Sequence, residues 1–494
     1  MRPQNLGDVI NREAPVEAIW LTAISPDGAA RRITFGEFRR TTDAMARGLL
    51  KRGLVRGARV GILAANSAEF LLAFYGILRA GMTAVPVNWK LPADTVAHIV
   101  RDASIELMFV DAEREALAGS AARTRLDDAA AWNELLDPGP HAVADMRDEE
   151  IALILYTSGS TGLPKGVPLT HGGYVWAVRQ LVEKGPPAAG RKMLIAAPLY
   201  HMNGLLQGTI MGAAGGSVVM LCRFTPLAYL EAAARERCEY VTVIPTMLAL
   251  VARERDAIAR LDLTGTELVV SGSAPASETL FAEAARIFPK ARVMNTWGTT
   301  EGSPVVFGPH PLGVPRPGLS VGYPLDVGDI RLEGGDDEGV LWVRNRAVMP
   351  GYLNRPEETA RRLHDGWYDT GDILRRDAEG FYYFVGRADD MFTCGGENVW
   401  PGEVESLLER HPDVAQAAVV PIDDPVKHRV PVAFVVPRPG TQPQPEAIKQ
   451  FALAHGPAYL HPRFVEIVAA LPLAGTNKVD RRALSERAAR SFSR

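Results

Sequence analysis

The sequence predicts an α/β protein with a large N-terminal body of layered α/β subdomains, a β-rich subdomain and a small α+β C-terminal lobe. Apolar strand-like runs alternate with Ala/Leu-rich helix-like runs in the first part of the chain, as expected for parallel strands joined by helices. After residue 325 short strands between Asp/Gly-rich turns replace this pattern. A further change near residues 386–390 predicts domains over 1–386 and 390–494, joined at 387–389.

The elements of the body follow from its apolar runs, taken in chain order. Short apolar runs rich in β-branched residues predict strands, which lie at 59–63, 83–87, 107–110, 151–155, 240–244, 267–271 and 292–295. A helix is predicted at 68–80, between the first two strands. Asp/Gly-rich turns at 326–339 and strands at 340–344 and 382–385 predict the compact β-rich subdomain.

The lobe is predicted to contain both helices and strands. Pro401 suits a first helical turn, and Val404, Leu407 and Leu408 form an apolar stripe at helical spacing, which predicts a helix over 401–410. Later elements are strands at 414–420 and 431–436, a Pro-rich surface connection at 437–445 and a helix at 445–455. A cleft between body and lobe is the expected place for a ligand.

Length and composition describe an ordinary globular protein. The chain has 494 residues, 47% hydrophobic content and a formal net charge of −4, so neither nucleic acid nor an anionic membrane is an expected partner. The N-terminal residues lack an apolar signal region and no stretch could span a bilayer, so we expect a cytoplasmic protein without stable membrane insertion. The three cysteines (Cys222, Cys238 and Cys394) are too scattered for a disulfide framework or metal site. The sequence leaves open whether the protein forms a homodimer.

Residues 156–167 read Tyr-Thr-Ser-Gly-Ser-Thr-Gly-Leu-Pro-Lys-Gly-Val and follow a predicted strand. Glycines allow backbone N–H groups to approach phosphate, hydroxyls add donors, and a lysine adds positive charge. The spacing differs from the Walker loop. A flexible surface loop is the alternative, but the preceding strand and the length of the motif favour phosphate binding. The predicted phosphate contacts are Thr157, Ser158, Gly159, Ser160, Thr161, Gly162 and Lys165.

Three further motifs accompany this loop, at 295–301 (Asn-Thr-Trp-Gly-Thr-Thr-Glu), 367–372 (Trp-Tyr-Asp-Thr-Gly-Asp) and 471–481 (Leu-Pro-Leu-Ala-Gly-Thr-Asn-Lys-Val-Asp-Arg). With the phosphate loop they resemble the adenylate-forming (ANL) superfamily over nearly the whole chain. The resemblance is strongest to bacterial acyl- and aryl-CoA synthetases, a group that includes 4-chlorobenzoate ligases. It implies an AMP-forming acid:CoA ligase that uses ATP, Mg²⁺ and CoA, and that makes AMP and pyrophosphate through an acyl-adenylate.

The resemblance implies roles for the nucleotide-site residues. Thr300 is expected to contact the α-phosphate, and Glu301 with Thr157 to hold Mg²⁺. Trp297 is expected to stack on adenine where most relatives carry tyrosine, and Asp372 with Arg387 to bind the ribose. The remaining predicted nucleotide contacts are Ser273, Ala274, Pro275, Gly298 and Thr299.

The resemblance also implies that the C-terminal lobe moves. Lys478 is expected to reach into the cleft and bridge the substrate carboxylate and the α-phosphate during adenylation. Asp389 matches the family's hinge position. A rotated lobe is expected to withdraw Lys478 and to bring Gly395 and Gly396 to the CoA channel.

The acyl pocket is predicted by position in the resemblance. His201 is expected near the reacting carboxylate, with a satisfied core or surface histidine as the alternative. The other predicted lining residues are Met202, Val243, Met247, Ser271, Asn295 and Gly302. No cation occurs between 241 and 251, so the lining favours an aliphatic or aromatic monocarboxylic acid.

The sequence is compatible with three functions. The leading interpretation is an acid:CoA ligase. A ligase that loads the thiol of a carrier protein is the first alternative, and it differs only in the acceptor. A nucleotide-binding homologue without turnover is the second, which the presence of Lys165, Glu301, Asp372, Arg387 and Lys478 disfavours.

Overall fold

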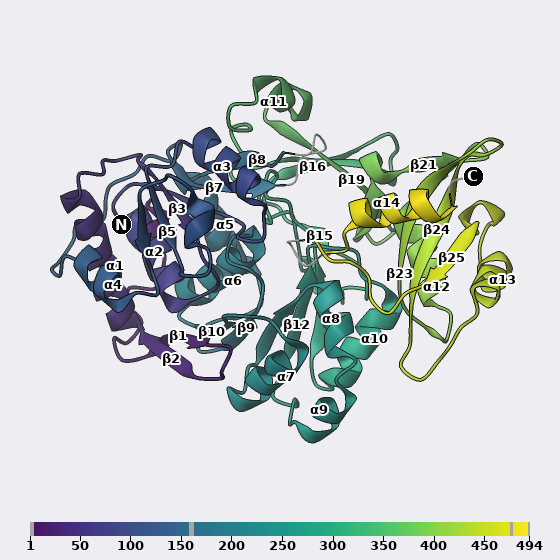
Figure 1. Cartoon of the computed structure of the whole chain (residues 1–494), viewed down its shortest axis with the longest axis horizontal. Helices are drawn as coiled ribbons and strands as arrows, with labels where there is room; N and C mark the ends of the chain where they lie inside the picture. The colour runs from purple at the N-terminus through teal and green to yellow at the C-terminus, as the bar shows by residue number, and fades with distance from the viewer. Residues whose placement is uncertain (1–3, 158–162, 475–477, 493–494) are drawn as a thin grey trace.

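A computed structural model describes residues 4–157, 163–474 and 478–492. Two mainly parallel sheets build the body, and the C-terminal lobe lies at the far end of the molecule from the N-terminus (Figure 1). In spatial order, the six-stranded sheet consists of β6 (Arg123–Arg125), β5 (Leu107–Val110), β3 (Arg59–Leu63), β4 (Thr83–Pro86), β7 (Ile151–Thr157) and β8 (Lys165–Thr170). The seven-stranded sheet consists of β13 (Arg292–Thr296), β12 (Leu268–Gly272), β11 (Tyr240–Val243), β9 (Lys192–Ile195), β10 (Ser217–Leu221), β1 (Ile19–Ile24) and β2 (Ala30–Thr34).

Helices connect and cover these sheets. They are α1 (Phe35–Lys51), α2 (Ala68–Arg79), α3 (Ala93–Asp102), α4 (Ala129–Leu135), α5 (His171–Lys184), α6 (Met202–Ala213), α7 (Pro226–Arg235), α8 (Pro245–Val251), α9 (Arg255–Arg260) and α10 (Glu278–Ile287), with 3-10 turns η1 (Leu6–Asp8) and η2 (Glu115–Ala118). Helix α2 shows why they form, because the Ser67 hydroxyl caps its first turn by accepting from the Phe70 N–H and almost all its residues are buried. Among the described helices, none is both long enough and apolar enough to cross a bilayer.

The β-rich subdomain follows, as the sequence predicted. After the short pair β14 (Phe307–Gly308) and β15 (Tyr323–Pro324), it consists of β16 (Asp329–Glu333), β17 (Glu338–Arg344), α11 (Pro356–Arg362), β18 (Leu363–His364), β19 (Trp367–Arg376) and β20 (Tyr382–Arg387). Every strand pair of this five-stranded sheet is antiparallel. The sheet brings the end of β20 beside the middle of β19.

The C-terminal lobe has a hydrophobic core of its own, between Phe392 and Ala488. Its elements are η3 (Ala388–Asp390), β21 (Phe392–Cys394), β22 (Glu397–Val399), α12 (Pro401–Glu409), β23 (Val414–Asp424), β24 (His428–Pro437), α13 (Pro445–His455), η4 (Ala458–Leu460), β25 (Phe464–Ile467) and α14 (Arg481–Phe492). The predicted α/β class, with a β-rich subdomain and an α+β lobe, is confirmed. Strands β23 and β24 extend beyond their predicted ends because they pair as one long hairpin, whose exposed tip carries no apolar pattern.

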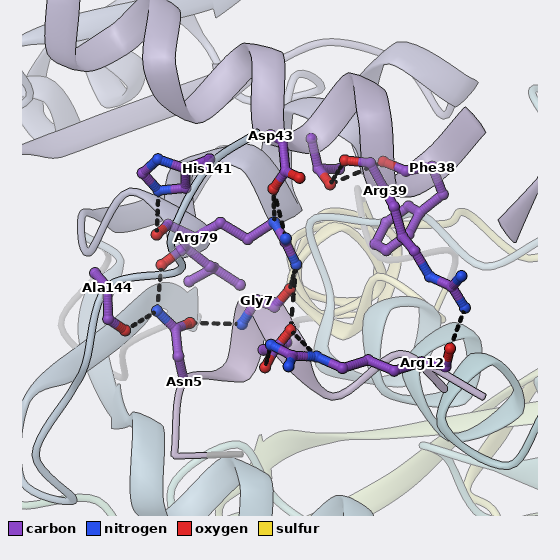
Figure 2. Close-up of polar contacts among 12 residues, drawn as sticks. Asn5, Gly7, Arg12, Phe38, Arg39, Asp43, Arg79, His141 and Ala144 are labelled. Atoms are coloured by element: carbon purple, nitrogen blue, oxygen red, sulfur yellow. Dashed lines mark hydrogen bonds and ion pairs between the residues drawn. The ribbon is translucent and has the colours of Figure 1, made fainter. Parts of the chain in front are cut away.

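Buried polar contacts hold the N-terminal segment against the body (Figure 2). Arg79, at the end of α2, is 7% exposed and donates to the Asp43 carboxylate at 3.0 Å and to the Gly7 carbonyl at 3.2 Å. The Asn5 side chain donates to the Ala144 carbonyl at 3.0 Å. The guanidinium of Arg79 and the side-chain amide of Asn5 both have hydrogen-bond partners. These polar contacts therefore fix the segment, which has no apolar core of its own.

Candidate active site

A cavity of about 1330 Å³ lies where the body meets the lobe. Its walls come from loops that follow strands of the seven-stranded sheet, from the β-rich subdomain and from the lobe. The predicted site residues that line it are Thr157, Lys165, His201, Met202, Met247, Ser273, Ala274, Pro275, Asn295, Trp297, Gly298, Thr299, Thr300, Glu301, Asp372, Arg387, Asp389 and Lys478. Residues that are far apart in the sequence therefore share one cavity.

The phosphate motif forms a β-hairpin. Thr157 ends β7 and pairs with Lys165, the first residue of β8, so both ends of the predicted loop are strand. The sequence prediction missed this because Gly166 and Pro168 hide a strand whose Val167 is fully buried. The predicted contacts Ser158, Gly159, Ser160, Thr161 and Gly162 lie outside the described residues.

Lys165 has two partners that the sequence did not indicate. Its ammonium forms an ion pair with Glu358 of α11 and lies 5.1 Å from the centre of the Tyr352 ring. The hydrogen bond from Lys165 holds the pKa of Glu358 below its ordinary value. No motif joins these residues, since they are far apart in the sequence and meet only through tertiary packing.

Thr157 and Glu301 bring two oxygen ligands together at the end of β7. The Thr157 hydroxyl donates to the Glu301 carboxylate at 3.1 Å, and the Tyr352 hydroxyl lies 3.4 Å from the same oxygen. The Met349 N–H donates to the Glu301 carbonyl at 2.8 Å, which fixes the backbone of that loop. A hydroxyl beside a carboxylate is suited to a hard divalent cation.

Asp372 is held between two donors. The Trp297 indole N–H donates to its Oδ2 at 2.8 Å, and Nη1 of Arg387 lies 3.6 Å from its Oδ1. Burial raises the pKa of Asp372, while Arg387, Trp297 and Lys478 oppose that shift. Arg387 also faces Asp389 at 3.8 Å, and Arg362 binds Asp389 at 3.1 Å.

Lys478 projects from the lobe into the cavity, where water still reaches it. Desolvation by the surrounding walls lowers its pKa below the ordinary lysine value. Asp372 and Glu301 oppose that shift and Arg387 adds to it. The charged groups of the cavity therefore come from both domains: Glu301, Asp372 and Arg387 from the body and its end, and Lys478 from the lobe.

His201 immediately precedes α6 and is neutral. Burial lowers its pKa to about 3, with smaller contributions from the charges of Lys478 and Lys90. Its Nε2 has no hydrogen-bond partner among the described residues. The ring of Tyr200 packs edge-on at 4.6 Å. A neutral imidazole with an unused nitrogen is therefore available on the cavity wall.

The structure does not bring five other predicted residues to the cavity wall. Val243 packs in the core behind the seven-stranded sheet, and Ser271 is fully buried beside the lining residue Val270. The alternation of side chains along a strand explains this, because neighbouring residues face opposite sides. Gly302 packs beside Tyr368 and Val343. Gly395 and Gly396 form the exposed turn between β21 and β22.

The sequence matches two family models that together cover most of the chain. The family model for AMP-binding enzymes matches residues 11–353, and the model for the AMP-binding enzyme C-terminal domain matches residues 403–478. The chain belongs to the AMP-binding enzyme family. The feruloyl-CoA synthase of Amycolatopsis sp is 32% identical, over 97% of this chain and 98% of that protein.

Two further relatives are a ligase named for an acyl-carrier protein and a CoA ligase of known structure. The fatty acid–[acyl-carrier-protein] ligase ScoC of Streptomyces coeruleorubidus is 31% identical to this AMP-binding enzyme, over 92% of this chain and 92% of that protein. The crystal structure of the anthranilate CoA ligase AuaEII in complex with anthranoyl-AMP has a TM-score of 0.88 and 26% identity, covering 98% of this chain and 97% of that chain.

These findings establish the reaction class. The AMP-binding enzyme is an acyl- or aryl-CoA synthetase of the ANL superfamily, as the sequence predicted. It uses ATP to join a small carboxylic acid to CoA through an acyl-adenylate, with release of AMP and pyrophosphate.

Proposed function

We propose that this ligase activates a monocarboxylic acid with an elongated apolar body, either an extended aromatic acid or an aliphatic chain. The observation that carries the proposal is an apolar stripe of α6 on the cavity wall, formed by Met202, Leu206 and Ile210 at intervals of about one helical turn. The polar side chains of Asn203 and Gln207 flank this stripe. Eight residues of helix span about 12 Å, which is deeper than a short acid needs.

The opposite wall of this channel supports the same substrate class. It is formed by one face of the seven-stranded sheet, through Met193, Leu268, Val270 and Met294. Methionine side chains adapt their shape and suit a flat or flexible apolar ligand. Feruloyl-CoA synthase, which resembles this chain over nearly its whole length, bears the name of an extended aromatic acid.

The nucleotide and Mg²⁺ are assigned to the other part of the cavity. Glu301 and Thr157 would hold Mg²⁺, whose charge stabilises phosphate oxygens. Lys165 and Thr300 would bind phosphate, Trp297 adenine, and Asp372 with Arg387 the ribose.

The acid and the lobe complete the proposed mechanism. Neutral His201 would lie beside the substrate carboxylate as a hydrogen-bonding group without forming a charged ion pair with it. Lys478 would offset the negative charge that develops between carboxylate and α-phosphate. Rotation of residues 390–494 about 387–389 would then remove Lys478 and bring Gly395 and Gly396 to the CoA arm. Three free cysteines support a reducing, cytoplasmic location.

The test is a panel of acids assayed for AMP release with ATP, Mg²⁺ and CoA. We expect hydroxycinnamic and medium-chain acids to be used at least tenfold better than acetate or propionate, because each buried methylene contributes about 0.8 kcal/mol. Ile210→Trp should fill the channel and remove this preference, whereas Leu227→Trp, at an exposed position of α7, should not. A preference for short acids in the unmodified enzyme would contradict the proposal.

A further inference from the structure

Trp297 donates its indole N–H to a carboxylate in another part of the fold. Trp297 directly follows β13 of the seven-stranded sheet, and Asp372 lies within β19 of the antiparallel sheet. The two sheets share no strand pairing in the described chain. The 2.8 Å hydrogen bond therefore joins two sheets directly at the cavity.

The remaining contacts of Asp372 leave its carboxylate little freedom. Its backbone N–H donates to the Thr370 hydroxyl at 3.0 Å, and that hydroxyl donates to the Leu341 carbonyl at 2.7 Å. Arg387 faces Oδ1 at 3.6 Å, and only 6% of Asp372 is exposed. The indole is thus the donor that sets the position of Oδ2.

The indole itself is held by packing. Phe307 contacts the Trp297 ring edge-on at a centroid distance of 5.8 Å, and Tyr382 packs on Phe307 at 5.1 Å. Trp297 and Phe307 both line the cavity. A rigid aromatic ring that carries a donor can therefore fix a carboxylate while its face stays available to a ligand.

We propose that Trp297 is a positioning residue whose N–H orients Asp372 to accept the ribose hydroxyls of the nucleotide. The inference rests on the proposed function, in which Asp372 binds the ribose. It separates two contributions of one residue, because the ring face would serve adenine and the N–H would serve ribose recognition. Phenylalanine would keep a smaller aromatic face and remove the donor, and the loss of ring area would affect all adenine nucleotides equally.

The experiment compares AMP, 2′-deoxy-AMP and 3′-deoxy-AMP by titration calorimetry. In the unmodified enzyme we expect AMP to bind more tightly than both deoxy analogues. Trp297→Phe should weaken AMP about tenfold, the loss expected of one hydrogen bond to a charged group, and should weaken each deoxy analogue less, because each keeps only one ribose hydroxyl for Asp372. Asp372→Asn should also reduce the preference for AMP, and Trp132→Phe on α4 is the matched control that should retain it.

Several outcomes would overturn the positioning role. These are an unchanged AMP preference in Trp297→Phe, an equal loss for all three nucleotides, and no preference in the unmodified enzyme. Trp297→Met provides a second variant without a side-chain donor if the phenylalanine variant does not fold. Failure of the proposed function is distinguishable, because it would appear as absence of acid-dependent pyrophosphate release, whereas the binding comparison needs no turnover.

Discussion

Glu358 of α11 forms an ion pair with Lys165 at the start of β8, across 193 residues of sequence. Both side chains are largely buried, with exposures of 13% for Lys165 and 18% for Glu358. A phosphate that approaches Lys165 must therefore compete with a carboxylate that already holds it. If Lys165 binds phosphate as proposed, ATP binding would depend on a residue outside every nucleotide motif.

Glu358→Gln is expected to tighten ATP binding. The amide can still accept a hydrogen bond from Lys165 but no longer neutralises its charge, so KM for ATP should fall roughly fivefold, the scale of one partly exposed ion pair. The maximal rate should change little. Steady-state kinetics with varied ATP will measure both values. Glu357→Gln, at an exposed position of the same helix, is the control, and a higher KM in Glu358→Gln would show that the pair positions Lys165 instead.

Lys478→Ala is expected to separate the two half-reactions. Loss of one preorganised charge should slow adenylation by roughly 10²–10³, as removal of an oxyanion donor does. Thioester formation from supplied acyl-adenylate should be largely spared, because the proposed rotation withdraws Lys478 before that step. Pyrophosphate exchange and a direct thioester assay measure the two steps, with Lys449→Ala on α13 as control. Equal losses in both would contradict the rotation.

The contact between lobe and body contains a carboxyl group that titrates near neutrality. Glu409 of α12 packs against the body, where the Thr279 hydroxyl donates to its backbone carbonyl at 3.3 Å. Burial raises the pKa of its carboxyl to about 7; a hydrogen bond from Ser277, at the start of α10, and the charge of Arg438 oppose this. The negative charge of Glu405 adds to the shift.

This contact is expected to weaken as pH rises. A lobe rotated away would expose Glu409 and return its pKa towards the ordinary 4.5. The protonated form then favours the observed contact below pH 4.5, and the advantage disappears as pH rises through 7, at up to about 1.4 kcal/mol per pH unit. Fluorescence energy transfer between labels on body and lobe, from pH 5.5 to 8, will follow this change. Glu409→Gln should flatten it and Glu446→Gln should not; a pH response unchanged in Glu409→Gln would exclude this carboxyl as its source.

The sequence predicted the class of the fold and most of the cavity, for different reasons. Apolar runs defined β3 and β5 to the residue because both strands are buried and bounded by polar turns. Glu301, Asp372 and Lys478 were predicted because the motifs that contain them resemble those of a known family, and the resemblance implied their roles. Neither source indicates which face of a doubly covered sheet a residue occupies, since both faces are apolar.

That limit explains why Val243 and Ser271 were wrongly predicted to line the cavity. Tyr240 of β11 and Leu268 and Val270 of β12 line it instead, on the other face of the sheet. Contacts between distant segments also left no signal in the sequence. The hydrogen bond from Trp297 to Asp372 and the ion pair of Lys165 both depend on how two separate elements pack. A pair of this kind can be recognised only from coordinates or from covariation between related sequences.

His171 is expected to make the body less stable in mild acid. The residue is fully buried at the start of α5, where its Nδ1 accepts the Leu6 N–H at 3.0 Å and its Nε2 has no partner in the described chain. Burial lowers its pKa to about 4, with the charge of Glu150 opposing and that of Arg56 adding to the shift. The folded protein thus keeps this imidazole neutral where the unfolded chain protonates it.

The direction of this stability change follows from the pKa of His171, which is 6.5 in its ordinary state and about 4 in the folded protein. Between pH 6.5 and about 4 the unfolded state binds the extra proton, so stability falls with pH by up to about 1.4 kcal/mol per unit from this residue alone. His171→Asn places an amide oxygen near the position of Nδ1 and cannot be protonated, so its melting temperature should fall less between pH 7 and pH 5 than that of the unmodified protein. His364→Asn, at an exposed position, should behave as the unmodified protein does. An equal fall in all three proteins would mean that carboxylates with lowered pKa values, such as Glu150 beside Arg56, dominate acid unfolding instead.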